Sequence, residues 1–95
     1  MRYLRCNGSD GQLLGRVGVR TLYAELDEAG TVVAEVGVDE WGLVVHRYPS
    51  RSPLFPFGED GLLGGRTMDA SGASPAEAEE AEREFKRLWP WPDSF

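Results

Sequence analysis

The 95-residue sequence contains a single cysteine and a single histidine, and this scarcity excludes several kinds of protein. One cysteine, Cys6, cannot form an internal disulfide, so the chain is not a small secreted domain held together by disulfides. Together with His46 it cannot supply the ligands of a Cys/His zinc site. The aspartates are scattered and lack the spacing of a calcium-binding loop. We therefore expect neither a metal nor a cofactor.

Long apolar runs are also missing. No stretch approaches the roughly 18–20 residues that cross a bilayer, and the N-terminus alternates polar and apolar residues instead of forming a signal region. These features predict a cytoplasmic location.

Basic residues are fewer than acidic ones, with 10 Lys and Arg against 16 Asp and Glu, and the formal net charge is −6. An acidic chain repels phosphate backbones and anionic lipids, which disfavours binding to nucleic acids or membranes. The charge favours a basic protein partner, because opposite charges speed encounter.

What the sequence does contain is enough apolar material for one folded domain, with 41% hydrophobic and 11% aromatic residues. A chain of this length buries only about 60–65% of the surface that its unfolded form exposes, so the core is thin. We expect a single domain over residues 1–95.

The first half predicts an antiparallel β-meander. Strands are expected at about 17–26, 31–38 and 43–48, with a less regular strand at 1–6. The same signal, Asp-Glu-x-Gly, separates the last three strands at 27–30 and again at 39–42. Connections this short make neighbouring strands antiparallel, and the aspartates are expected to bond the backbone of their own turns.

The faces of these strands are less clear. In 17–26 neither face is purely apolar, so the pattern leaves open which one is buried. In 31–38 alternation places four apolar residues on one face (Val32, Ala34, Val36 and Val38) and Glu35 on the other. The same alternation predicts that His46 shares a face with Val44 and Tyr48.

The second half predicts a loop followed by a helix. Residues 49–73 are rich in Pro and Gly but carry several large apolar side chains, which indicates a packed irregular loop with room for a short edge strand near 62–68. Helix 74–89 begins with a Ser-x-x-Glu capping box and has a narrow apolar stripe. The expected fold is α+β, an antiparallel meander of three to five strands with one C-terminal helix packed on it.

No residue forms a recognisable catalytic group. His46 has no identifiable nucleophile or orienting partner in the sequence, and a surface or half-buried strand histidine is the favoured interpretation. Cys6 reads as a small buried strand residue. We expect no enzymatic activity, and the alternative is an enzyme or small-ligand-binding protein that uses the strand residues His46, Glu25 and Arg47.

Two surfaces are candidates for binding a partner protein. The first is the second turn, where Trp41 occupies a position in which a large side chain is hard to bury, next to Asp39 and Glu40. The second is the acidic side of the predicted helix, for which a solvated face balanced by basic residues is the favoured interpretation and a docking surface for a basic protein is the alternative. The residues assigned to partner binding are Trp41, Glu40, Asp39, Glu79, Glu80 and Glu84.

The first half resembles a family of small, uncharacterised bacterial domains common in actinobacteria. The resemblance lies in a Tyr-x-Glu-Leu-Asp hairpin followed by a second turn closed by glycine, here Tyr23, Glu25, Leu26, Asp27, Gly30 and Gly42. Families of this kind often occur as immunity proteins beside polymorphic toxins. The resemblance implies a protein that binds and neutralises a toxin domain, and it brings no catalytic residue.

The leading hypothesis is therefore a non-enzymatic protein-binding domain, most specifically an immunity-type inhibitor of a cognate toxin. Besides the enzyme or ligand-binding alternative, a third hypothesis is an accessory subunit that oligomerises through a sheet edge such as 1–6, because an uncovered edge strand can pair with another chain.

Overall fold

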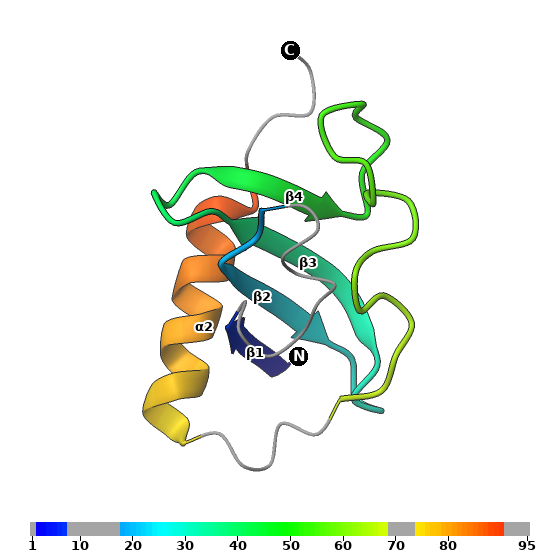
Figure 1. The fold of residues 1–95 in the computed structure, drawn as a ribbon. Helices are drawn as coiled ribbons and strands as arrows, with labels where there is room; N and C mark the ends of the chain where they lie inside the picture. The colour runs from blue at the N-terminus through cyan, green and yellow to red at the C-terminus, as the bar shows by residue number, and fades with distance from the viewer. Residues whose placement is uncertain (1, 8–17, 69–73, 91–95) are drawn as a thin grey trace.

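A computed structural model describes residues 2–7, 18–68 and 74–90, and its centre is a four-stranded antiparallel sheet in the order β1-β2-β3-β4. One helix, α2, packs on one face of the sheet (Figure 1). This confirms the predicted α+β fold. The elements are β1 (Arg2–Asn7), β2 (Thr21–Leu26), β3 (Val32–Val38), β4 (Val44–Tyr48) and α2 (Pro75–Leu88).

The two Asp-Glu-x-Gly turns have the same hydrogen bonds. In the first, Asp27 Oδ1 accepts from the backbone N–H groups of Ala29 and Thr31, both at 2.9 Å. In the second, Asp39 Oδ1 accepts in the same way from the residues two and four positions later, again at 2.9 Å. Each turn ends at a glycine with positive φ, 84° at Gly30 and 81° at Gly42. This backbone is what a short hairpin connection with a left-handed glycine requires, and both aspartates bond their own turns as expected.

Helix α2 begins as the sequence predicts. The Ser74 hydroxyl accepts from the Glu77 N–H at 3.2 Å, and proline occupies the first turn. Its apolar stripe, Ala81, Phe85 and Leu88, packs on one face of the sheet. The sheet residues of this cluster are Tyr3, Tyr23, Ala34, Val36 and Val38.

The opposite face of the sheet is buried as well. Residues 49–68, which we call the covering segment, run along the side of the sheet away from α2 (green to yellow-green in Figure 1). Leu62 and Leu63 of this segment pack against apolar side chains of β2, including Leu22. Strand β2 is thus buried on both faces, which answers the question that the sequence leaves open about which of its faces meets the core.

The covering segment leaves β4 and then returns to β3. Arg66 accepts a hydrogen bond from the Val32 N–H at 2.9 Å, and Thr67 forms an isolated bridge with Thr31. Because β2 occupies one edge of β3, these contacts fall on the edge that β4 also uses. The end of the covering segment therefore pairs briefly with β3, in line with β4. This pairing lies within residues 62–68, where the sequence predicts room for a short edge strand.

Two register shifts break the alternation that the sequence suggested. In β3 the partner of Leu26 is Val32 and that of Glu25 is Ala34, so one extra residue lies between them. This bulge moves Val32 to the covering-segment face, and the prediction that it shares a face with Ala34 is wrong.

A second shift lies in β4, where Val38 pairs with Val44 and Gly37 pairs with His46. The extra residue there is Val45. Val44 packs with the α2 cluster, whereas His46 lies on the opposite face, so the prediction that these two share a face is also wrong. Bulges insert a residue without a sequence signature as regular as alternation, which is why neither was foreseen.

Candidate functional site

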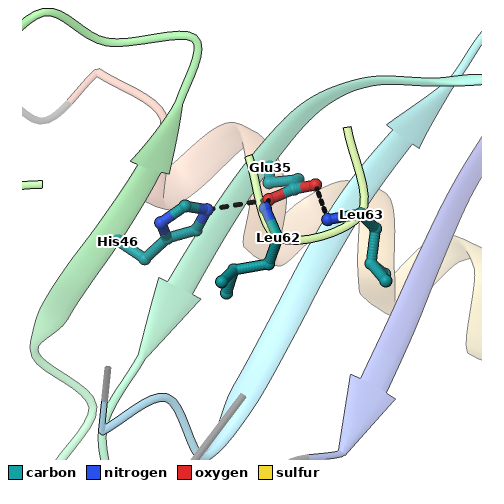
Figure 2. Close-up of polar contacts among 4 residues, drawn as sticks. All are labelled: Glu35, His46, Leu62 and Leu63. Carbon is teal, nitrogen blue, oxygen red and sulfur yellow. Dashed lines mark hydrogen bonds and ion pairs between the residues drawn. The ribbon is translucent and has the colours of Figure 1, made fainter. Parts of the chain in front are cut away.

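The most unusual group in the protein is a buried ionisable pair. Glu35 on β3 and His46 on β4 are both fully buried, with no measurable exposure. His46 Nε2 lies 2.7 Å from Glu35 Oε1 (Figure 2). Buried ionisable side chains occur where they are paired and hydrogen-bonded, because taking a lone charge out of water is very costly.

The covering segment supplies two further donors to the same carboxylate. The backbone N–H groups of Leu62 and Leu63 donate to Glu35 Oε1 and Oε2 at 2.8 and 2.6 Å. Figure 2 shows both residues of the covering segment against the carboxylate. An ionised carboxylate is the form suited to this environment, since it only accepts. His46 Nε2 is then the donor of the remaining bond. Glu35 thereby ties β4 and the covering segment to β3.

The other ring nitrogen of His46, Nδ1, has no hydrogen-bond partner within the described part of the chain. A carboxylate that orients one imidazole nitrogen while the other stays available is an arrangement found in acid–base catalysis. Here the imidazole is sealed under the covering segment, so a substrate has no access to it in this conformation. The arrangement fits a structural tie.

Glycine 37 makes room for this pair. It lies between Glu35 and the end of β3 and is the cross-strand partner of His46. A Cβ atom there would lie 2.9 Å from a methyl group of Val19 and 3.1 Å from the His46 Cβ. The absence of a side chain at this position lets Val19 and His46 pack over the strand.

The structure does not bring together the three strand residues of the alternative enzyme hypothesis. Glu25 accepts a hydrogen bond from the Tyr3 hydroxyl at 2.7 Å on the α2 side of the sheet. Burial, the hydrogen bond to Glu25 and the charges of Glu25 and Glu82 raise the pKa of Tyr3 to about 12. The guanidinium of Arg47 lies over the Trp89 ring, 4.3 Å from its centroid, next to the same cluster. His46 is on the opposite face, so the structure places these three side chains on two different faces of the sheet.

The second turn borders an open hollow of about 400 Å³. We call it the Trp41 hollow, after a side chain that is 76% exposed. Strand residue Val45 and the segment before β2 complete it. Its lining residues are Gly18, Val19, Arg20, Asp39, Glu40, Trp41 and Val45. Three residues predicted to bind a partner, Asp39, Glu40 and Trp41, are thus on one surface feature.

The helix glutamates predicted to bind a partner do not line this hollow. Glu84 pairs with Arg87 at 2.6 Å, and Glu80 lies 4.0 Å from Arg5 of β1. Glu79 is exposed. Exposed pairs of this kind contribute about 0–1 kcal/mol each, so they leave the helix face charged and hydrated.

Comparison with known proteins gives no relative: no family model, no curated protein and no solved structure matches the chain. Within residues 2–7, 18–68 and 74–90, no group of three His, Cys, Asp or Glu side chains is placed to hold a metal ion. The search of the same residues finds no helix with the length and apolar character to cross a membrane.

Glu35 was not singled out from the sequence as more than a polar member of its strand. The sequence feature that could have pointed to it is its position as the single carboxylate among the valines, alanine and glycine of β3. An acidic residue in the middle of an otherwise apolar strand indicates either an exposed face or a buried partner. Only the three-dimensional position of Leu62 and Leu63 decides between these possibilities.

Proposed function

We propose that this protein is a non-enzymatic protein-binding domain that engages a basic partner through the Trp41 hollow. The immunity-type role follows as the specific form of the proposal, in which the partner is a toxin domain that binding neutralises in the cytoplasm. The observation that carries the proposal is the exposure of Trp41.

The turn itself does not need a tryptophan. Ala29 occupies the equivalent position of the first turn, which has the same hydrogen bonds and the same glycine conformation. The indole of Trp41 therefore contributes nothing to the turn that a methyl group would not. Large aromatic side chains that stand beside apolar floors and polar rims are typical of binding hot spots.

Charge supports a basic partner. The chain carries a net charge of −6, and two of the residues that line the hollow are carboxylates. Opposite charge on a partner speeds encounter and disfavours wrong partners. A toxin that acts on nucleic acid would carry such a charge, which agrees with the immunity-type role.

The experiment is co-expression with the products of the neighbouring genes, followed by affinity purification. We expect a basic protein to be retained by the natural chain and lost with Trp41→Ala. Leu54→Ala is the matched control, because Leu54 is also a large exposed side chain, at 54%, but lies in the covering segment. If Trp41→Ala retains the partner as well as the control does, the proposed surface is wrong.

Growth rescue separates the immunity-type role from plain binding. If the retained neighbour is toxic when expressed alone, the natural chain should restore growth and Trp41→Ala should not. Retention without any toxicity would contradict the immunity-type role and leave the binding proposal standing.

A further inference from the structure

We propose that the Trp41 hollow receives an arginine side chain of the partner. This inference rests on the proposed function and specifies what the partner presents. The hollow combines an apolar floor, Val19 and Val45, an aromatic wall, Trp41, and carboxylates on Asp39 and Glu40. A side chain that fills it needs an apolar stem and a cationic end.

Arginine meets these conditions best. Its stem is aliphatic, and its flat guanidinium stacks on an indole face while it donates two parallel hydrogen bonds to a carboxylate. The protein already contains such a stack, since the guanidinium of Arg47 lies 4.3 Å from the centroid of Trp89. The Trp41 ring is mostly exposed and offers comparable stacking surface to a residue from outside.

Glu40 is the carboxylate most suited to the guanidinium. Asp39 Oδ1 already accepts two backbone N–H groups within the turn, whereas Glu40 is exposed. Arg20 also lines the hollow, and its positive charge opposes a bound cation. Two carboxylates and one guanidinium line the hollow, so its net charge still favours a cation. Removing the positive charge of Arg20 should therefore strengthen the binding of a cation.

A second copy of the chain is a poor occupant. Two molecules that each carry a net charge of −6 repel one another as they approach. A basic partner with an exposed arginine gains from the same field. The charge therefore favours a heterologous partner for the hollow.

The test uses the full chain and three short peptides that differ in one side chain: arginine, citrulline or leucine between flanking glycines, with blocked ends. Citrulline keeps the shape of arginine but removes the charge. Binding is followed by the indole N–H resonance of Trp41, assigned by its loss in Trp41→Phe. We expect saturable shifts with the arginine peptide and at least fivefold weaker binding of the other two.

Three variants sharpen the test. Glu40→Gln should weaken arginine-peptide binding severalfold, and Arg20→Gln should strengthen it by a similar factor. Glu59→Gln is the matched control for charge, because Glu59 is an exposed carboxylate of the covering segment that does not line the hollow. It should leave the affinity for the arginine peptide within about twofold of the natural chain.

Equal or tighter binding of the citrulline or leucine peptide, or no saturable shift with arginine, would overturn the arginine inference. Those outcomes do not touch the proposed function, which is tested separately by whether Trp41→Ala loses the natural partner. If the partner is retained through Trp41 and yet replacing each of its exposed arginines by glutamine has no effect, the inference is likewise wrong.

Discussion

At the scale of single residues, Glu35 joins the covering segment to the sheet through two hydrogen bonds. Its carboxylate accepts from His46 and from the N–H groups of Leu62 and Leu63; the first two contacts are buried and the third is partly buried. Replacing Glu35 by Gln keeps the size but leaves one acceptor oxygen and adds an amide that faces a donor. Loss of a buried, charge-assisted bond of this kind costs about 2–4 kcal/mol.

We therefore expect Glu35→Gln to lower the free energy of unfolding in urea by about that amount. Glu59→Gln, an exposed glutamate of the covering segment, should change it by less than about 0.5 kcal/mol. A Glu35→Gln protein as stable as this control would show that the carboxylate does not hold the segment in place.

Tyr3 gives a prediction about alkaline pH. Its pKa is raised to about 12 in the folded protein from the ordinary value of 10, and burial also raises the pKa of Tyr23. In the folded state Tyr3 holds its proton over a range in which the unfolded chain has lost it. Stability contributed by this residue is complete below about pH 10 and falls as the pH rises towards 12.

Tyr3→Phe removes this titration. We expect the free energy of unfolding of the variant to decline less between pH 10 and pH 12 than that of the natural chain, as measured by urea denaturation across this range. Parallel declines would mean that the Tyr3 hydroxyl is not perturbed by burial and by Glu25.

The turn aspartates and Glu35 differ in how far away along the chain their hydrogen-bond partners lie. The aspartates of the turns were interpreted correctly, because their partners lie two and four residues away. The role of Glu35 could not be read in the same way, since two of its partners are 27 and 28 positions distant in a segment without regular structure. Nothing in a local pattern reports which backbone N–H groups return to a strand after such an interval.

At the scale of elements, the two turns offer a matched comparison. Gly30 and Gly42 both have positive φ, so alanine is strained at either position by about 1–2 kcal/mol. A Cβ at Gly30 would also lie 3.0 Å from the Met68 carbonyl oxygen, whereas one at Gly42 meets nothing within 4 Å. The first turn is therefore covered by the end of the covering segment and the second is open.

We expect Gly30→Ala to destabilise the protein more than Gly42→Ala in urea denaturation, with the Gly42→Ala loss close to the strain of the backbone alone. Equal losses would contradict the packing of Met68 against the first turn.

The elements that were predictable are those with local signals. The Asp-Glu-x-Gly turns, the capping residue Ser74 and the stripe of α2 all follow from residues within a few positions of one another. The bulges at Val33 and Val45 and the return of residues 65–68 to β3 depend on contacts across the sheet. For this reason the number and type of elements could be foreseen, but the faces on which Val32 and Val44 lie could not.

At the scale of the whole molecule, the net negative charge should raise the rate at which the chain associates with a basic partner. Association of this chain with a basic partner should slow as salt is raised from low to physiological concentration, since the Debye length falls from about 30 Å at 0.01 M to about 8 Å at 0.15 M. Stopped-flow association rates measure this directly. An association rate independent of salt would show that the net charge of −6 does not steer the encounter.

The exposed Trp41 turn and the buried Glu35–His46 pair have separate roles. The Glu35–His46 pair joins β3 to β4, while the Trp41 hollow is open beside the second turn. A change at Trp41 should therefore alter binding and spare folding.

The measurement that tests this most directly is the dissociation constant of the partner complex for Trp41→Ala, determined beside its free energy of unfolding. We predict at least about 30-fold weaker binding, the effect of losing a hot-spot residue, with stability changed by less than about 0.5 kcal/mol. Unchanged affinity, or a loss of affinity that only accompanies unfolding, would contradict the assignment of Trp41 to a binding surface.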